Sequence, residues 1–508
     1  MKKIIVLLLA LCIAGAFAGC KNGSSSGDGG GKASDREDVV ISLKSDPKTF
    51  DPVSTSTSSA NTVMFQIYDS LIHMNEEFEV EPRLAESYKV SDDEKTYTFK
   101  LAEGVKFHNG EALKASDVVY SIKRAQKSPY TSAYVDSVDY AEVVDDNTVA
   151  VHLTDVDASF LEKIQIIMIV NEKTVKEAGK SYADHPVGTG PYKFVSYKAG
   201  VEVKLTRFDD YYRGAARIKD VDYQIITDDN TATVNLRTGD VDAGSFARAS
   251  YDEVMNEPAL TVADWSANSL YYFAVNNEVA PFNDPIVRQA INYAIDREYI
   301  AEVETNGLSK ITSVMLPPSV FGYSDEINQT YTYDPDKARE LLKKAGIKTP
   351  MEIGTIKIPE GDGKNAAEAL QQCLSEIGLE VEIEILEQNK FYDETDFGDY
   401  EIAWCQISLL RDADSYSILF TSDQIDGMNT ARYSNPKVDK LFTQAKATTD
   451  QKERLRLYAE VFNLIGEDAA YIPVYVPTNI YAYNKNLKID VLHPSMKEYC
   501  FTADKIPM

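Results

Sequence analysis

Apolar and polar residues alternate in several short runs of the chain, and this pattern predicts β-strands. In 96–101, for example, Tyr97, Phe99 and Leu101 fall on one face. Runs of similar strand-like composition lie at 149–153, 192–195, 201–205, 270–275 and 471–476. The runs at 192–195 and 201–205 are joined through Lys198-Ala199-Gly200, a connection that is typical of a β-hairpin.

Helical periodicity follows four capping signals. Asp284, Asp334 and Asn435 each precede a proline, which suits the first turn of a helix. Asp450 stands three residues before Glu453, the spacing of a capping box, and the helix that follows is expected to turn inward Leu455, Tyr458, Phe462 and Ile465. Because strands and helices alternate, the sequence predicts an α/β chain with several sheets and with antiparallel hairpins in its first half.

The first twenty residues have the pattern of a signal peptide. Lys2 and Lys3 are followed by an apolar stretch at 4–17 that is too short for a comfortable membrane span. The run FAGC at 17–20 resembles the lipobox of bacterial lipoproteins, in which the cysteine, here Cys20, is lipidated and becomes the mature N-terminus. An ordinary secretory signal with an incidental cysteine is the alternative. Residues 21–38 are rich in Gly, Ser and Asp and predict a flexible tether.

Charge and cysteine content narrow the function classes. The 508 residues include 52 Lys and Arg against 80 Asp and Glu, a net charge of −28, which disfavours nucleic acid as a partner. With Cys12 removed in the signal peptide and Cys20 lipidated, three cysteines remain that allow at most one disulfide: Cys373, Cys405 and Cys500. They form no CxxC motif and no cluster with histidine, so no metal site is predicted.

No arrangement of residues points to catalysis. A G-x-S-x-G string at 23–27 lies in the tether, without a strand before it or a helix after it. The five histidines are scattered, and none belongs to an HxxxH or HExxH pair. A secreted hydrolase is therefore the weaker hypothesis, and we expect no enzyme and no cofactor.

Residues 82–125, which include LAES at 84–87 and GVKFHNG at 104–110, differ in kind from the rest. This stretch resembles the signature of the family 5 extracellular solute-binding proteins, the oligopeptide-, dipeptide- and nickel-binding components of ABC importers. Further blocks resemble the same family in the same order: SDPKTFDP at 45–52, GTGPYKF at 188–194, and the segments 276–297, 333–346 and 431–445. The resemblance thus covers nearly the whole chain after the tether.

The resemblance implies an α/β fold of the periplasmic-binding-protein-like type II clamshell, with two lobes, an inserted extra domain and mixed sheets. Mapped onto this chain, it places the first lobe at 39–78, 185–277 and 486–508, the inserted domain at 79–184 and the second lobe at 278–485. It also implies a monomer that encloses a peptide or other small solute between the lobes and delivers it to an ABC permease with its ATPase subunits. Together with Cys20, this predicts an extracytoplasmic protein held at the cell membrane by a lipid anchor.

Family peptide binders commonly present an aspartate to the α-ammonium of the ligand, three residues after a tryptophan of the second lobe. Here Trp404 is followed at that spacing by Ile407, which departs from the pattern. If Asp414 and the downstream Leu419-Phe420 set the register instead, the family's ammonium-binding position falls on or beside Arg411. A cation there would repel a free amine and favour a carboxylate. Asp412 or Asp414 is the alternative source of the acid. The resemblance also makes Gln406, beside Trp404, and Asn276, at the end of a strand, candidate ligand contacts.

Each candidate also has a structural interpretation. Trp404 and Trp265 suit a hydrophobic core as well as a ligand platform, Asn276 suits a turn cap, and Arg411 with its two acidic neighbours suits a surface ion cluster. The polar run 54–59 either lines the edge of the first lobe or is a plain loop. Residues 278–485 contain no histidine, which disfavours nickel capture. An oligosaccharide, a metal chelate, or a signalling or adhesion role remain alternatives to peptide uptake.

Overall fold

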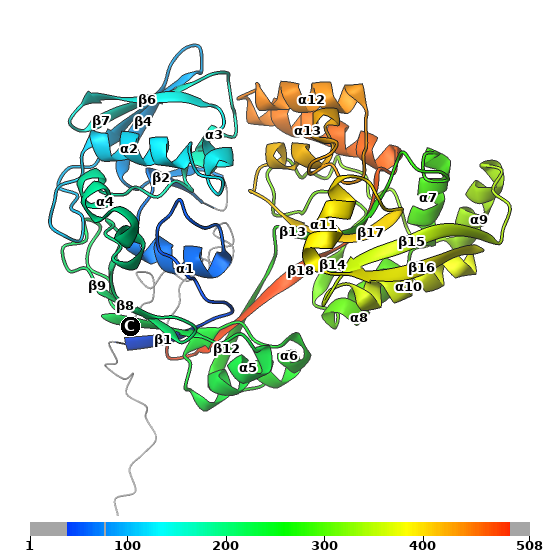
Figure 1. Ribbon diagram of the computed structural model, residues 1–508, viewed down its shortest axis with the longest axis horizontal. Coiled ribbons are helices and arrows are strands. Elements are labelled where there is room, and N and C mark those ends of the chain that lie inside the picture. The colour runs from blue at the N-terminus through cyan, green and yellow to red at the C-terminus, as the bar shows by residue number, and fades with distance from the viewer. Residues whose placement is uncertain (1–37, 76–77, 488–508) are drawn as a thin grey trace, which may run out of the picture. The chain divides into compact units, whose positions relative to one another are not determined.

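The computed structural model describes residues 38–75 and 78–487, which form a mixed α/β fold (Figure 1). The predicted signal peptide with Cys20, nearly all of the tether, Cys500 and the last part of the expected first lobe lie outside the described residues. Asp38, expected at the end of the tether, is instead the first residue of β1, where it pairs with Asp220. No helix in the described ranges is both long and apolar enough to cross a membrane.

The largest sheet has twelve strands in the order β16-β15-β17-β13-β18-β11-β1-β10-β9-β8, and β12 and β14 also pair with β18. It is mixed, because β1 runs parallel to β10 while β10, β9 and β8 alternate in direction. One group of its strands comprises β1 (Asp38–Leu43), β8 (Tyr192–Lys198), β9 (Glu202–Arg207), β10 (Asp220–Ile225), β11 (Ala243–Gly244) and β12 (Leu260–Ser266). The other comprises β13 (Ser269–Val275), β14 (Ser309–Ile311), β15 (Met351–Pro359), β16 (Leu379–Leu386) and β17 (Ile402–Ser408).

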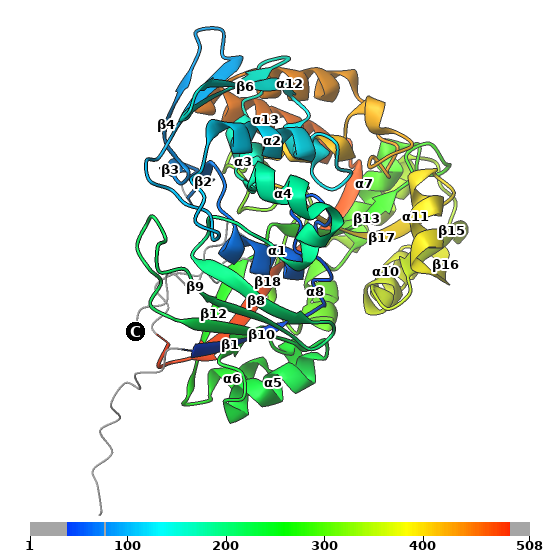
Figure 2. The ribbon, with the colours of Figure 1, turned by 60° about the vertical axis from the view of Figure 1, so that its left-hand side comes forward.

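The two groups are joined by β18 (Tyr471–Asn484), drawn in red in Figures 1 and 2. Its first part pairs with β13 and its last part with β12, so this one strand belongs to both groups. The sequence predicted a strand that ends at residue 476, and this is wrong by eight residues. Pro477, the next residue, has no N–H to donate to a ladder. Its carbonyl oxygen nevertheless accepts a hydrogen bond from the Ala267 amide at 3.0 Å, and the strand continues.

Two smaller sheets lie in the first part of the chain. One is antiparallel, in the order β4-β5-β7-β6, and is formed by β4 (Ala85–Val90), β5 (Thr96–Leu101), β6 (Val138–Asp145) and β7 (Thr148–Leu153). The other pairs β2 (Ile72–Met74) with β3 (Val80–Pro82). The strands predicted at 96–101 and 149–153 are confirmed, and they pair with each other as β5 and β7. The helix α2 (Ala115–Ala125) shares their hydrophobic core. The hairpin predicted around Lys198-Ala199-Gly200 is confirmed as β8 and β9.

The predicted capping signals are confirmed. Asp284, Asp334, Asn435 and Asp450 each accept a backbone N–H in the first turn of α7 (Pro285–Ala294), α9 (Pro335–Lys344), α12 (Pro436–Lys446) and α13 (Gln451–Glu467). Two details of α13 differ from the prediction. The carboxylate of Glu453 pairs with Arg456, so it does not complete a capping box, and Leu457 is buried where Leu455 is only half-buried.

The other helices are short to medium in length. They are α1 (Ser58–Ile67), α3 (Phe160–Ile164), α4 (Glu172–Ala178), α5 (Asp229–Thr238), α6 (Tyr251–Met255), α8 (Arg297–Thr305), α10 (Lys364–Glu376) and α11 (Gln388–Asp396). Short 3₁₀ turns add η1 (Ser132–Val135), η2 (Gly179–Asp184), η3 (Arg248–Ser250), η4 (Ala413–Leu419) and η5 (Ser422–Gln424).

Two of the sequence blocks that carry the family resemblance meet beside the C-terminal end of α1. A Cβ atom on Gly188 would lie 2.0 Å from the carbonyl oxygen of Ile67, and one on Gly190 would lie 2.6 Å from that of Gln66, so only glycine fits at either position. His108 contacts the same loop: its Nε2 lies 2.9 Å from the carbonyl oxygen of Gly190, and its Nδ1 lies 3.4 Å from the amide of Gly188. These contacts fit a neutral imidazole that donates through Nε2 and accepts through Nδ1.

This arrangement predicts an acid-sensitive contribution to stability. Burial lowers the pKa of His108 from 6.5 to about 4. Between these values the unfolded chain binds more protons at this residue than the folded chain, so the free energy of unfolding falls as the pH decreases through that window. The full loss is about 3 kcal/mol, since each pKa unit corresponds to about 1.4 kcal/mol.

The measurement is urea denaturation of the wild type and of His108→Gln at pH 7.0 and pH 4.0. The wild type is expected to lose more stability between the two pH values than the variant, whose amide does not titrate. Other carboxyl groups contribute equally to both proteins and cancel in the difference. An identical pH dependence of the two proteins contradicts the prediction.

Candidate functional site

A cavity of about 620 Å³ lies beside β1, β12 and the last part of β18. Its size falls within the range of about 300–1,000 Å³ that is usual for small-molecule sites. The lining is mixed, with apolar side chains and many short polar ones: Ile41, Ser42, Leu43, Lys44, Ser58, Ser59, Thr62, Asp229, Asn230, Ser245, Phe246, Ala247, Arg248, Ala249, Trp265, Asn479, Ile480 and Tyr481. It therefore suits a solute that has both polar and apolar parts.

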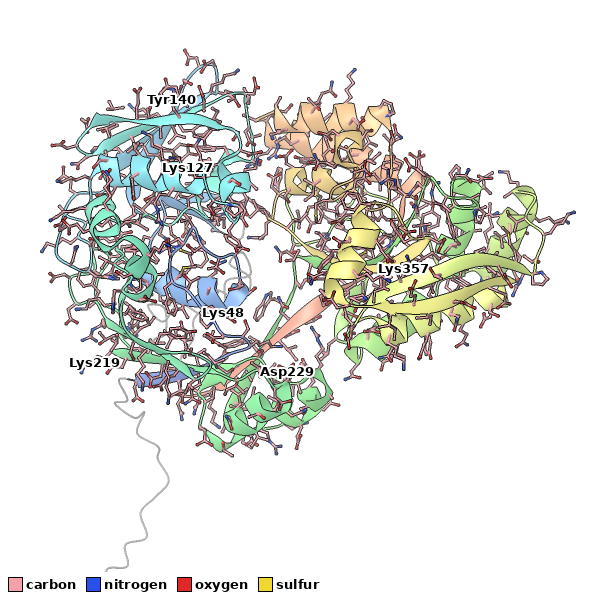
Figure 3. All side chains as sticks on the ribbon, viewed as in Figure 1. Lys48, Lys127, Tyr140, Lys219, Asp229 and Lys357 are labelled. Atoms are coloured by element: carbon pink, nitrogen blue, oxygen red, sulfur yellow. The ribbon has the colours of Figure 1, made fainter. Side chains whose placement is uncertain are left out.

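Two cations and one acid line this cavity. Lys44, at the end of the β1 region, pairs with Asp229 at the start of α5, with Nζ 3.2 Å from Oδ1; Figure 3 labels Asp229 on this helix. Arg248, in η3, donates from Nη1 to the carbonyl oxygen of Leu308 at 3.1 Å. Burial lowers the pKa of Arg248, while Tyr271, Tyr475 and Asp229 act in the opposite direction. The lining thus carries a positive balance although the chain as a whole carries −28.

Two features that the sequence singled out reach the cavity. Trp265 on β12 lines it, directly across from Asn479 of β18. Ser58 and Ser59, from the polar run at 54–59, line it from the first turn of α1. Of the two interpretations of that run, the lining of an edge is the one that fits these two residues.

Two of the candidate ligand contacts, Trp404 and Asn276, are packed inside the protein. Trp404 on β17 is 1% exposed, and its ring lies 4.7 Å from that of Phe273 and 5.6 Å from that of Tyr271. A Cβ atom on Gly363 would lie 2.0 Å from the indole, so the backbone closes over the ring. Asn276, also 1% exposed, donates to the carbonyl oxygens of Gly398 and Tyr400 at 2.9 and 3.1 Å. Both positions match the structural interpretations of these residues.

Gln406, two residues after Trp404 on β17, is exposed. It is not among the residues that line the cavity described above. Neighbouring residues of a strand point to opposite faces, so Gln406 and Trp404 share a face, which is covered at Trp404 and open at Gln406.

Arg411, Asp412 and Asp414 are each at most 6% exposed, so their interpretation as a surface cluster is wrong. The guanidinium of Arg411 lies 4.5 Å from the ring centroid of Phe78, and its Nε donates to the carbonyl oxygen of Ser319 at 3.2 Å. Asp412 is bound by Arg454 of α13, whose Nη2 lies 2.8 and 2.9 Å from the two carboxylate oxygens. These groups are already paired within the protein.

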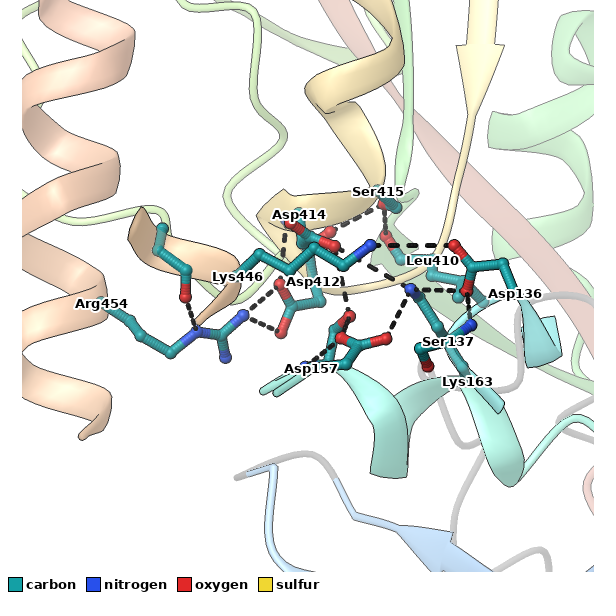
Figure 4. A network of polar contacts seen from close by, with 12 residues as sticks. Asp136, Ser137, Asp157, Lys163, Leu410, Asp412, Asp414, Ser415, Lys446 and Arg454 are labelled. Atoms are coloured by element: carbon teal, nitrogen blue, oxygen red, sulfur yellow. Dashed lines mark hydrogen bonds and ion pairs between the residues drawn. The ribbon is translucent and has the colours of Figure 1, made fainter. Parts of the chain in front are cut away.

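Asp414 belongs to a network that links the 410–454 region to residues 136–163 (Figure 4). Its carboxylate accepts a hydrogen bond from Ser159 at 3.3 Å and lies 4.0 Å from the Nζ of Lys163. Lys163 lies closer to Asp157 at 2.9 Å and to Asp136 at 3.2 Å. Asp136 in turn lies 3.7 Å from Lys446 of α12. The network therefore joins segments that are far apart in the sequence.

Burial dominates the electrostatics of this network. It raises the pKa of Asp414 to about 6, with a further increase from Asp412, while Lys163 opposes it. It also raises the pKa of Glu162 to about 7, and Arg411 opposes that shift. For Lys163, burial alone would lower the pKa, but Asp157, Asp136 and Asp414 outweigh burial and raise it. Such shifts accompany ion-pair networks as well as functional sites, so they assign no ligand role by themselves.

The cavity residues Arg248, Asp229 and Phe246 were missed by reasoning from the sequence. They lie in a helix start and a short turn whose local composition is ordinary, and no motif separates them from other polar loops. The described ranges also contain no group of three or more His, Cys, Asp or Glu residues that could hold a metal ion. The free thiols Cys373 and Cys405 are not part of the cavity.

Comparisons with known proteins identify relatives along most of the chain. The family model of the bacterial extracellular solute-binding proteins, family 5 Middle, matches residues 79–427. Heme-binding protein A of Haemophilus influenzae is 30% identical over 482 residues, which cover 87% of this chain and 88% of that protein. The oligopeptide-binding protein AppA of Bacillus subtilis is 27% identical over 98% of this chain and 97% of its own.

Solved structures agree over a similar length. The ABC transporter substrate-binding protein CtaP of Listeria monocytogenes superposes with a TM-score of 0.84 at 28% identity, covering 94% of this chain and all of the other. The structure of AppA from Bacillus subtilis, in complex with a nonapeptide, superposes with a TM-score of 0.76 at 27% identity and covers 93% of this chain and 99% of the other. The two-lobed α/β clamshell predicted from the sequence is thereby confirmed.

Proposed function

Because the chain belongs to the family 5 bacterial extracellular solute-binding proteins, we propose that it captures a peptide between its two lobes and delivers it to the permease of an ABC importer. Members of this family are extracytoplasmic transport components and not enzymes. The finer parts of the proposal, namely a peptide as the ligand, a lipid anchor on Cys20 and a monomeric state, rest on the sequence patterns and on the relatives.

The cavity of about 620 Å³ is the observation that carries the proposal. It lies beside β12, which pairs with the last part of β18, while β13 pairs with the first part. Only Ala267 and Asn268 connect β12 to β13. A short connection of this kind is suited to a hinge, because few residues absorb the change when two rigid groups of strands move. Capture would then be closure around the bound solute, which shifts the population toward the closed state to the extent that this state binds the solute more tightly than the open one.

For the domain boundaries we keep the inserted domain at 79–184 and change one limit of the lobes. Residues 478–484 of β18 pair with β12, which belongs to the first group of strands. The first lobe is therefore proposed to resume near Pro477 and not at residue 486. With this change, every residue that lines the cavity falls within the first lobe, so the cavity is proposed as the first-lobe side of the space that encloses the solute.

Mass spectrometry of the solute that co-purifies with the full chain tests the proposed ligand. We expect peptides of a few residues to be released when the purified protein is unfolded in guanidinium chloride. A sample that has been unfolded, dialysed and refolded before the same treatment is the control, and it should release none. Recovery of an oligosaccharide or a metal chelate in place of peptides contradicts the peptide assignment, and turnover of any recovered compound contradicts the binding role.

A further inference from the structure

Arg248 differs from the other charged residues of the cavity in lacking a counter-ion. Its guanidinium donates to the carbonyl oxygen of Leu308, and within residues 38–75 and 78–487 no carboxylate lies within 4.0 Å of it. Lys44, the other cation of the lining, is paired with Asp229. A guanidinium remains charged at neutral pH even where burial disfavours the charge. The cavity wall therefore holds one positive charge that has no direct ion-pair partner in the described residues.

A partly desolvated charge without a partner is costly, and a ligand that supplies the opposite charge offsets that cost. The planar fork of arginine matches the two oxygens of a carboxylate, and such bidentate pairs are stronger than neutral hydrogen bonds. Trp265 lines the same cavity, and its indole Nε1 is buried without a hydrogen-bond partner in the described structure. The wall thus offers a second donor to an acceptor group.

We propose that Arg248 binds a carboxylate of the captured solute and thereby selects for it; in a peptide this is the C-terminal carboxylate. The inference rests on the proposed function, because it concerns the ligand of the same cavity. It goes further by naming the residue that recognises the ligand and the chemical group that is recognised. It also accounts for the positive balance of the lining in a strongly acidic chain.

A structural role is the competing explanation, since Arg248 joins η3 to the carbonyl of Leu308 in the proposed second lobe. The two roles predict different results with matched ligands. A bridge between backbone segments has no means of distinguishing a carboxylate from a carboxamide. A carboxylate-binding residue must distinguish them, because an amide carries no charge and offers only one acceptor oxygen.

The test uses the full chain, the variants Arg248→Gln and Arg248→Lys, and Arg237→Gln as a matched control. Arg237 lies on α5, is 38% exposed, pairs with Glu253 and does not line the cavity. Two probes are titrated by calorimetry after refolding to remove bound solute. One is a tripeptide pool of uncharged side chains with free C-terminal carboxylates, and the other is the same pool with C-terminal amides.

The wild type and Arg237→Gln are expected to bind the free-acid pool about 10- to 100-fold more tightly than the amide pool. Arg248→Gln should bind both pools alike, and Arg248→Lys should keep part of the preference. Equal binding of the two pools by the wild type overturns the inference, and so does an undiminished preference in Arg248→Gln. The proposed function survives either result, because peptides still bind.

Failure of both pools to bind the wild type contradicts the peptide proposal, and the inference is then decided with the solute that co-purifies. It holds if that solute carries a carboxylate and if Arg248→Gln lowers its affinity about 10- to 100-fold while Arg237→Gln does not. A solute without a carboxylate, or the recovery of none, overturns it.

Discussion

Replacing Arg454 by methionine is expected to destabilise the protein by about 3–5 kcal/mol, because removal of one partner leaves a buried charge uncompensated. The Arg454 side chain is 5% exposed and that of Asp412 is 8% exposed. Arg454 is also 3.0 Å from the hydroxyl of Tyr458 and 3.3 Å, through Nε, from the carbonyl oxygen of Ala445. The change is measured as a shift of the guanidinium chloride midpoint, with fluorescence and circular dichroism as independent probes.

Arg456→Met is the matched control, since it lies two residues further along the same helix. Arg456 is 53% exposed and pairs with Glu453 and Glu460, and exposed pairs of this kind contribute little to stability. The double variant Arg454→Met/Asp412→Leu should be more stable than Arg454→Met alone, because neither charge is then left unpaired. Equal midpoints for Arg454→Met and Arg456→Met would show that the buried pair is not a major contribution to the stability of this region.

The sequence predicted those local elements that depend on a single short-range interaction. The caps at Asp284, Asp334, Asn435 and Asp450 and the hairpin of β8 and β9 depend on residues within a few positions of one another. The length of β18 did not follow, because its continuation past Pro477 depends on β12, some two hundred residues earlier. Long-range pairing of this kind leaves no local signal.

For the candidate site, too, the sequence identified individual residues but not their partners from distant segments. Arg411, Asp412 and Asp414 were identified as charged residues near a ligand position, but the sequence carries no sign that Arg454, Ser159 and Lys163 bind them from other elements. Arg248 had no signal at all, because an arginine in a short polar turn is ordinary until the fold places it on a cavity wall. Burial and lack of a counter-ion are properties of the fold, and a single sequence does not encode them in any pattern of spacing.

The two tryptophans of the chain are expected to report different properties. Trp404→Ala should lower the free energy of unfolding by about 3–5 kcal/mol, because it removes a fully buried ring and leaves a cavity between β13 and β17. Phe273 and Tyr271 would lose their aromatic contacts with it. Trp265→Ala should lower stability much less, since its side chain is only partly buried at the cavity wall. Chemical denaturation followed by circular dichroism measures both changes.

Replacement of Trp265 should affect the fluorescence response to ligand more than replacement of Trp404, the reverse of their order for stability. With only two tryptophans, the fluorescence change on addition of the free-acid tripeptide pool can be assigned by single replacements. The change should persist in Trp404→Phe, which keeps an aromatic ring in the core, and should be lost in Trp265→Phe, because only the indole at the cavity wall contacts the solute. Loss of the response in Trp404→Phe alone would mean that the solute binds near β17, where the sequence resemblance first placed it.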